Sequence, residues 1–266
     1  MNRLPISVSM IAGAEARRIG RSLESVAPWV GEMIVVLNAD VNDGIEEIAR
    51  RHGATVFREP WKGFVAQKAS AAAKSTQEWV LGLDADEVVS PELCEEVRRL
   101  FENDKALDKF AAFSVPRLTM FCGRWIRHGD WYPDRITRLW RRGAATWGGG
   151  QIHETLRVNG PVGKLRGDLL HYTAATIDDQ LAKSAPYSDA FVREMRRQNR
   201  PASWFDLALR PGWRFLRAYF FRLGFLDGWQ GYYIAWMTAM HTLTRYAKVR
   251  EAAAAGLAQP EPRPRP

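Results

Sequence analysis

The stretch Trp79–Leu93, WVLGLDADEVVSPEL, decides the fold class, because an apolar run is followed at once by two acidic residues. Residues 79–83 are apolar enough to form a strand that is buried on both faces, as strands of parallel sheets are. Asp84 and Asp86 follow where that strand ends. In open parallel sheets, ligands bind outside the carboxyl ends of the strands. The two aspartates therefore either form a polar turn or help to hold a divalent metal ion.

Strand and helix signals alternate through the first hundred residues. Apolar runs predict strands at 6–11, 33–37, 54–57 and 79–83, and helical spacing predicts helices at 14–26, 44–52, 64–74 and 92–101. Ser90 and Pro91 predict the N-cap and first position of the last of these helices. This order predicts an α/β fold, with a mostly parallel sheet that helices cover on both faces.

The pattern changes in the second half of the chain. Short strand-like segments separated by glycine-rich turns lie at 113–118, 134–140, 155–160 and 164–173. From Thr176 to about Arg250 the chain is predicted to be helical.

Composition limits the class of protein. The chain has 266 residues and a net charge of +8, with arginine concentrated between Arg117 and Arg250, which suits an anionic partner. The two cysteines, Cys94 and Cys122, suggest neither a disulfide framework nor a metal site, as in a cytoplasmic protein. We find no apolar run typical of a signal peptide or of a spanning helix.

Two familiar motifs are excluded. The turn after the first strand, IAGAEA at 11–16, lacks G-x-G-x-x-G, which disfavours a dinucleotide-dependent oxidoreductase. The segment IHETLR at 152–157 begins like a zinc H-E-x-x-H motif, but Arg157 stands where the second histidine is needed. The sequence therefore predicts no zinc site there.

Several stretches together carry a family resemblance. PISVSMIAGAEARRIGRSLESV, MIVVLNADVNDGIEEIARRHGATVF, EPWKGFVAQKASA and WVLGLDADEVVSPEL resemble the nucleotide-sugar half of family 2 glycosyltransferases, which have the GT-A fold. WYPDRITRLWRRGAATWGGGQIHETL, LLHYT and GFLDGWQGYYIAWMTAMHTLTRYAKV resemble later parts of the bacterial branch that adds a β-linked glucose to the lipopolysaccharide inner core. The resemblance extends from about residue 6 to residue 251.

The resemblance implies a domain organisation. A GT-A catalytic domain would occupy residues 1–176, with a nucleotide-sugar half at 1–112 and an acceptor half at 113–176. Residues 177–251 would form a helical, amphipathic extension associated with a membrane, and residues 252–266 a disordered tail.

The resemblance also implies site residues. Asp86 matches the metal-binding aspartate of the family, for Mg²⁺ or Mn²⁺, and Asp84 matches its partner near the ribose and diphosphate. Glu15 and Lys68 match positions that line the nucleotide pocket. His171 lies where related transferases place a metal-binding histidine, although a strand-end histidine with ordinary hydrogen bonds explains it equally well.

Two positions depart from the family pattern. The family commonly has Asn before the pocket glutamate, where this chain has Ala14, and Asp after the second strand, where it has Asn38. Asn38 keeps the size and one acceptor oxygen of an aspartate but loses the charge. We therefore expect altered nucleotide contacts at Asn38.

An inverting transferase needs a general base to take the proton of the acceptor hydroxyl. Glu154 is the first candidate, because Gly148–Gly150 allow close approach of acceptor and backbone. Asp134 is the second candidate. The alternatives are a surface salt bridge for Glu154 and an arginine-paired turn for Asp134. Nearby arginines either meet substrate phosphates or form a solvated face: Arg135, Arg138, Arg141 and Arg142.

Residues 204–250 combine aromatic side chains with arginines. Arg210, Arg214 and Arg217 fall on one side of a helix, and such a helix suits the membrane interface. The alternative is an aromatic helix packed on the domain or on a second copy of the chain, with its arginines in solvent.

The resulting hypothesis is a metal-dependent, inverting transfer of glucose from UDP-glucose to a lipid-linked saccharide, such as the lipopolysaccharide core. We expect the protein at the cytoplasmic face of the inner membrane. The sequence is compatible with a homo-oligomer as well as with a monomer. Nucleic acid is not expected as a partner, because the acidic strand ends would repel its phosphates. The alternatives are nucleotidyl transfer to a sugar phosphate and a weakly active or non-catalytic membrane-binding homologue.

Overall fold

The chain forms two compact units. The computed structural model describes residues 3–103, 107–149, 154–174 and 176–254. The first unit combines Met1–Met120 with Tyr132–Thr173, and the second combines Phe121–Trp131 with the chain from Ala174 onward. The second unit therefore includes a segment, residues 121–131, that the sequence assigned to the catalytic domain.

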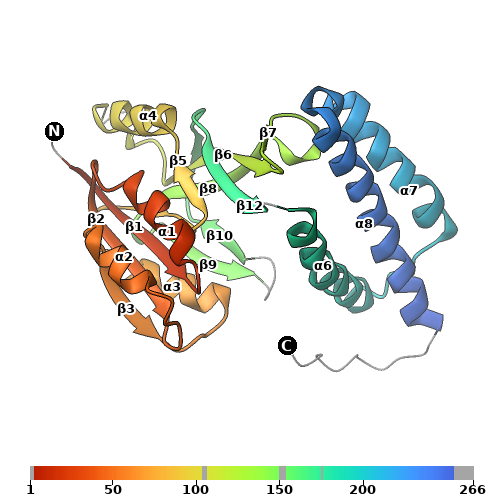
Figure 1. The fold of residues 1–266 in the computed structure, drawn as a ribbon, viewed down its shortest axis with the longest axis horizontal. Helices are drawn as coiled ribbons and strands as arrows, with labels where there is room; N and C mark the ends of the chain where they lie inside the picture. Colours follow the sequence, from red (N-terminus) through yellow and green to blue (C-terminus); the bar gives the residue numbers. More distant parts are fainter. Residues whose placement is uncertain (1–2, 104–106, 150–153, 175, 255–266) are drawn as a thin grey trace. The chain divides into compact units, whose positions relative to one another are not determined.

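Four parallel strands form one half of the main sheet (Figure 1). In spatial order they are β3 (Thr55–Glu59), β2 (Val30–Asn38), β1 (Leu4–Ala12) and β4 (Trp79–Gly82). Val8 of β1 pairs with Met33 of β2 on one side and with Leu81 of β4 on the other. β1 and β4 are flanked by strands on both sides and covered on both faces, so all four residues of β4 are buried, and in β1 the small Ser7 and Ser9 are buried along with Ile6, Val8 and Met10.

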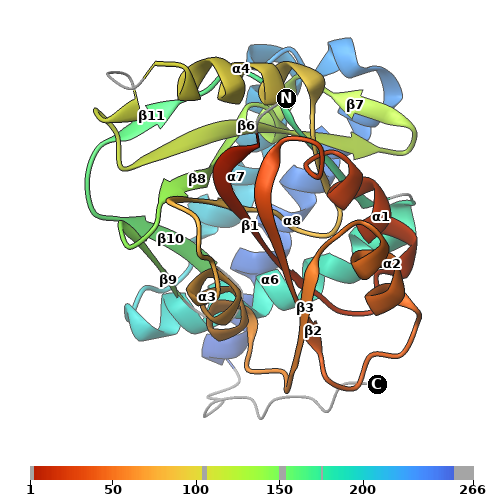
Figure 2. The ribbon, with the colours of Figure 1, turned by 90° about the vertical axis from the view of Figure 1, so that its left-hand side faces the viewer.

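Helices cover both faces of these strands (Figure 2). On one face, α1 (Ala16–Glu24), α2 (Ile45–Arg51) and α4 (Pro91–Phe101) contribute to the large core with Val35 and Leu37. On the other, α3 (Phe64–Ala73) packs Ala71 against Ile34 and Val36. Alternate residues of β2 thus serve opposite faces. The Ser90 hydroxyl accepts a hydrogen bond from the Leu93 amide at 3.1 Å and caps α4, as the sequence predicts.

The rest of the sheet is mostly antiparallel. Beyond β4 follow β8 (Asp134–Arg141), β6 (Ala112–Phe121), β12 (Leu169–Ala174) and β5 (Glu87–Val89), and β11 (Val162–Lys164) lies beside β6. The short strand β5 is not apparent from the sequence, in which no element is predicted between Asp86 and Ser90. It pairs with β12 so that His171 lies opposite Glu87. β9 (Ala145–Gly149) and β10 (Glu154–Val158) form a separate two-stranded ribbon.

The second unit is helical, as the sequence predicts. It contains α6 (Ile177–Arg197), α7 (Trp204–Leu216), the π-helical turn η2 (Arg217–Phe221), the 3₁₀ turn η3 (Gly224–Asp227) and α8 (Gly228–Ala254), together with β7 (Arg124–Ile126) and the 3₁₀ turn η1 (Gly129–Trp131). Val192, Met195, Tyr246 and Val249 form its core. α8 continues through Ala254, into the segment expected as a tail, and the remaining residues of that segment lie outside the described part of the chain.

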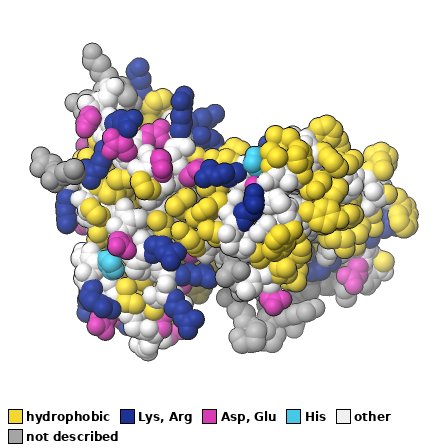
Figure 3. Space-filling view, turned by 45° about the horizontal axis from the view of Figure 1, so that its top comes forward, with side chains coloured by type: hydrophobic (Ala, Val, Ile, Leu, Met, Phe, Trp, Pro, Cys, Tyr) yellow, Lys and Arg dark blue, Asp and Glu magenta, His cyan; other side chains and the backbone are white. Residues whose placement is uncertain are grey.

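Hydrophobic side chains gather on the surface of this helical unit, which lies to the right in Figure 3. Over the described residues, each helix falls short of the length or apolar character that crossing a bilayer requires.

Candidate active site

Polar side chains meet at the carboxyl edge of the parallel strands. Glu15 is the N-cap residue of α1 in the turn after β1, Asn38 is the last residue of β2, and Asp84 follows β4. Because β2, β1 and β4 are neighbours in the sheet, the topology brings these three residues to one edge. This edge is where α/β sheets bind ligands.

Hydrogen bonds to the backbone of Asp84 hold the turn that carries Asp84 and Asp86. The Glu87 amide donates to the Asp84 carbonyl at 2.9 Å, and the Asp84 amide donates to Glu87 Oε2 at 3.1 Å. The Ser22 hydroxyl of α1 also donates to the Asp84 carbonyl, at 3.3 Å. These bonds hold the turn while the two aspartate side chains contact different partners.

The Asp84 carboxylate lies between two cations. Its Oδ1 is 3.0 Å from Lys68 Nζ, and its Oδ2 is 2.5 Å from Arg138 Nη2. Burial alone would raise the pKa of Asp84, but Arg138 and Lys68 outweigh it and hold that pKa well below its usual range. Asp84 is therefore an ionised carboxylate whose charge is balanced within the protein.

Arg138 is buried and paired with two carboxylates. Its side chain is 7% exposed, and its Nη2 also lies 2.6 Å from Oε1 of Glu87, which is fully buried. Burial would lower the pKa of Arg138, but Asp84 and Glu87 raise it above its ordinary value. The sequence interpretation left Arg138 either to phosphates or to solvent; the solvent alternative is wrong, and the phosphate alternative stays a prediction. The signal for its actual place is a glutamate, Glu87, inside an otherwise apolar strand.

Lys68 connects Asp84 to Glu154. Its Nζ lies 3.0 Å from Glu154 Oε1 as well as from Asp84 Oδ1, and its charge faces the ring of Trp147 at 5.1 Å. A narrow cavity here is lined by Ser9, Ile11, Lys68, Gly82, Leu83, Asp84, Arg138 and Trp147. Gly82 is required at this place, because a Cβ there would lie 2.9 Å from the ring of Trp140. Glu154, Lys68 and Asp84 thus form one continuous polar group.

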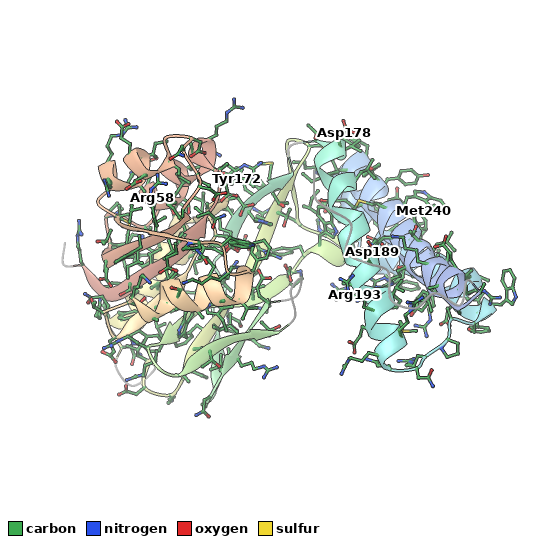
Figure 4. The ribbon with its side chains drawn as sticks, turned by 90° about the horizontal axis from the view of Figure 1, so that it is seen from below. Arg58, Tyr172, Asp178, Asp189, Arg193 and Met240 are labelled. Carbon is green, nitrogen blue, oxygen red and sulfur yellow. The ribbon has the colours of Figure 1, made fainter. Side chains whose placement is uncertain are left out.

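Asp86 faces His171. Its Oδ2 is 3.5 Å from His171 Nε2 and 3.9 Å from Arg18 Nη1. The Asp86 carbonyl accepts from the Tyr172 amide at 2.9 Å, so β12 is fastened to the turn; Figure 4 labels Tyr172. Thr119 Oγ1 lies 3.4 Å from His171 Nδ1; in the tautomer in which Nδ1–H donates a hydrogen bond to this oxygen, the lone pair of Nε2 is directed toward Asp86.

These contacts fit a divalent metal ion. A carboxylate oxygen and an imidazole nitrogen converge, and the other imidazole nitrogen has a hydrogen-bond partner, as metal-binding histidines do. Burial first, and then the negative charge of Asp86, raise the pKa of Glu15, while Arg18 opposes this shift. Among the described residues no group of three or more His, Cys, Asp or Glu is placed to hold a metal, so a bound ion would also need oxygens from substrate or water.

The second base candidate has a different setting. Asp134 Oδ2 accepts from Arg117 Nε at 3.0 Å and from Nη2 at 2.6 Å, and its side chain is 41% exposed. This is the arginine-paired arrangement that the sequence left as the alternative. The other arginines of this segment also bind the protein: Arg135 donates to the Leu165 carbonyl, Arg141 pairs with Glu78 and Asp108, and Arg142 donates to the Gln77 carbonyl.

Comparison with known proteins decides the family. Residues 7–147 match the family described as Glycosyl transferase family 2. A Rickettsia prowazekii glycosyltransferase, RP128, is 31% identical over 261 residues, which cover 92% of this chain and 87% of the relative. The chain is a family 2 glycosyltransferase. The expectation of nucleotidyl transfer is thereby set aside in favour of glycosyl transfer.

Two further proteins are similar to this glycosyltransferase. The Rhizobium meliloti lipopolysaccharide core biosynthesis glycosyltransferase LpsC is 27% identical over 259 residues, 92% of this chain and 94% of LpsC. A structure of S. aureus TarS residues 1–349 with UDP-GlcNAc superposes with a TM-score of 0.51 at 12% identity, covering 95% of this chain and 92% of TarS 1–349. The glycosyltransferase therefore has the predicted GT-A fold.

Proposed function

We propose that this glycosyltransferase moves glucose from UDP-glucose, with inversion at the anomeric carbon, to a hydroxyl of a lipid-linked saccharide of the lipopolysaccharide core type. One observation carries the proposal: Lys68 Nζ lies 3.0 Å from both Asp84 and Glu154. It connects the carboxylate assigned to the donor with the carboxylate assigned to the base. The relative LpsC supports the acceptor class, and UDP-GlcNAc in TarS supports a UDP-sugar donor.

Glu154 is the proposed base. Lys68 donates to its Oε1, which leaves Oε2 to accept the proton of the acceptor hydroxyl. As that proton leaves, the hydroxyl oxygen forms a bond to the anomeric carbon from the face opposite the diphosphate. The bond between the anomeric carbon and the phosphate oxygen breaks, and its electron pair departs with UDP. A single displacement of this kind inverts the anomeric configuration.

Asp84 and Asp86 have separate roles in this proposal. Because Lys68 and Arg138 already balance the charge of Asp84, it is suited to accept hydrogen bonds from the donor ribose. Asp86 and His171 would hold Mg²⁺ or Mn²⁺, and such an ion neutralises charge on a departing diphosphate. Glu15, Asn38 and Lys68 are proposed to line the nucleotide-sugar pocket around them.

The acceptor and the location are also part of the proposal. A lipid-linked saccharide would be presented at the cytoplasmic surface of the inner membrane, so we place the protein there as a peripheral protein. The net charge of +8 supports binding to an anionic acceptor or surface.

The decisive experiment is transfer by the purified protein with a panel of UDP-, GDP- and dTDP-sugars and a deacylated core oligosaccharide. We expect acceptor-dependent release of UDP from UDP-glucose and a β-linked product, assigned by the anomeric proton coupling in NMR. An α-linked product would refute inversion, and transfer from a different donor with none from UDP-glucose would refute the proposed donor.

A matched test separates the metal from the fold. EDTA and the variant Asp86→Ala should each abolish transfer, and Mn²⁺ should restore only the EDTA-treated protein. Undiminished transfer after both changes would refute the metal assignment.

A further inference from the structure

The helix α7 presents an apolar stripe to solvent. None of its thirteen residues, all described, is buried. Leu209, Trp213 and Leu216, with Phe220 of η2, follow one another at spacings of four, three and four residues, which place them on one side of a helix. Each is about half exposed. A helix that packed only within its own unit would bury such a stripe.

The helix α8 presents a second stripe. Trp229, Tyr232, Trp236 and Met240 are between 46% and 56% exposed, and Figure 4 labels Met240 on this helix. Phe215 of α7 joins the two stripes, because its ring lies 4.6 Å from that of Trp236 and 6.2 Å from that of Tyr232. We call these two stripes the apolar face. Contiguous apolar surfaces of this kind mark sites of interaction with a protein or a membrane.

Three arginines converge on one carboxylate beside the apolar face. Asp130 Oδ1 lies 2.8 Å from Arg217 Nη1 and 3.9 Å from Arg222 Nε, and Oδ2 lies 3.2 Å from Arg214 Nη2. Asp130 is 8% exposed, whereas the three guanidinium side chains, here called the arginine triad, are 34–41% exposed. One carboxylate balances one of these charges, so the triad keeps an excess positive charge within reach of solvent.

The sequence and the backbone conformation place the arginine triad next to apolar residues. Each of the three arginines directly follows an exposed apolar residue: Trp213, Leu216 and Phe221. In the π-helical turn η2 the Arg222 amide donates to the Arg217 carbonyl at 2.8 Å, five residues back. This wide turn returns Arg222 to the side of Asp130, and such turns are frequent at functional sites.

Charge distinguishes the possible occupants of this face. Residues 204–250 contain seven Lys and Arg but two Asp. Asp206 completes the capping box of α7 with Ser203 and pairs with Arg210, and buried Asp227 contacts His128 at 3.1 Å. A second copy would therefore bring positive charge against positive charge. Tryptophan and tyrosine beside arginine are instead the side chains that favour the interface of an anionic bilayer.

We propose that the apolar face enters the interface of an anionic bilayer and that the arginine triad binds the phosphates of its acidic phospholipids. Arginine suits this role because its guanidinium forms paired hydrogen bonds with phosphate oxygens. The inference rests on the proposed function only in the membrane location, and it deepens that location by naming the ligand and the residues.

Sedimentation of the full chain with sucrose-loaded vesicles tests this proposal. We expect binding to vesicles of equal parts phosphatidylglycerol and phosphatidylcholine, much weaker binding to phosphatidylcholine alone, and a loss of binding as salt is raised. Arg217→Gln/Arg222→Gln should lower the partition coefficient about 25-fold, since each basic residue near an anionic surface contributes about fivefold. Arg214 stays on Asp130 in this variant, so the buried carboxylate keeps a partner.

Matched controls make the outcome specific. Arg193→Gln/Arg197→Gln removes the same charge from exposed positions of α6 and should bind as the wild type does. Trp213→Ala/Trp229→Ala should weaken binding, whereas Trp61→Ala, an exposed tryptophan of the first unit, should not. Equal binding to both kinds of vesicle, or equal loss in both arginine variants, would overturn the proposal, as would a dimer that forms through this face and excludes vesicles.

The two proposals fail separately. The triad variant should release UDP with a soluble, deacylated acceptor as fast as the wild type. Loss of vesicle binding with that activity intact therefore bears on the triad alone, and intact vesicle binding without transfer bears on the proposed function alone.

Discussion

Glu87 Oε1 and Arg138 Nη2 form a buried ion pair 2.6 Å apart, and the same Nη2 lies 2.5 Å from Asp84. Glu87 belongs to β5 and Arg138 to β8, so the pair connects two strands that are not neighbours in the sheet. A charge in this position holds the Asp84 side chain in place. The orientation of Asp84 is therefore tied to the stability of the fold.

Arg138→Met should strongly destabilise the protein. Removal of Arg138 leaves the fully buried Glu87 carboxylate with only the longer contact to Arg117, 3.7 Å away, and takes from Asp84 one of its two cations; loss of one partner of a buried pair typically costs about 3–5 kcal/mol. Urea unfolding followed by circular dichroism measures the free energy of unfolding. The control is Arg99→Met, which breaks an exposed pair with Glu95 and should cost less than about 1 kcal/mol.

The double variant Arg138→Met/Glu87→Leu should recover much of that loss, because apolar residues often replace a buried pair without cost. Its transfer activity should nevertheless stay low, since Asp84 has lost Arg138. A double variant that is stable and fully active would show that Arg138 does not position Asp84.

Glu154→Gln should lower kcat by about 10²- to 10⁴-fold, the range typical of general-base catalysis. The glutamine keeps an oxygen for Lys68 but cannot take a proton, so the KM for the donor should change little. Asp134→Asn is the comparison, because Asp134 pairs with Arg117. If Asp134→Asn proves the more damaging change to kcat, the base is Asp134.

The parallel half of the fold is predictable because its strands are buried on both faces. Trp79–Leu83 is an apolar run that the sequence shows directly, and in Ile6–Met10 the residues between the apolar ones are serines small enough to be buried too. β5 is missed because its three residues carry no periodicity, and one of them is the buried Glu87. The assignment of residues 121–131 to the helical unit is missed because it depends on contacts such as Phe121 with Tyr233.

The site is predictable where it follows strand ends and not where it depends on pairing. Asp84 and Asp86 are predicted from their place after β4, Lys68 only through the family resemblance, and Glu154 from the need for a general base near the glycines that precede it. Along β8, arginines occur at every third position, at 135, 138 and 141, and the sequence does not show which of these side chains points into the protein. Fifty-one residues separate Arg138 from Glu87, and only the sheet order brings the two together.

Thr119→Val should weaken metal binding without removing a metal ligand. The hydroxyl lies 3.4 Å from His171 Nδ1, and loss of such a partner typically costs about 10- to 100-fold in metal affinity. Titration of Mn²⁺ in the presence of UDP, followed by electron paramagnetic resonance, measures the affinity directly. Thr76→Val, far along the chain at an exposed bond to Glu32, is the control. Equal affinities in the two variants would remove His171 from the metal site.

Glu59 should make stability depend on pH in a defined window. Hydrogen bonds from Lys74, Lys62 and Ser70 lower the pKa of Glu59 to about 2, from a model-peptide value of 4.5. A carboxyl whose pKa is lowered by folding stabilises the protein fully above its unfolded pKa, and this contribution is lost as the pH falls toward its folded pKa.

Glu59→Gln should therefore be less stable than the wild type at neutral pH, and the difference should shrink from about pH 5 toward pH 2. Urea midpoints across this range measure it, with Glu95→Gln as an exposed control. Because Ser70 and Lys74 fasten α3, which carries Lys68, to the end of β3, the variant should also raise the KM for the donor at neutral pH. Parallel pH profiles for wild type and Glu59→Gln would show that these bonds do not stabilise the folded state.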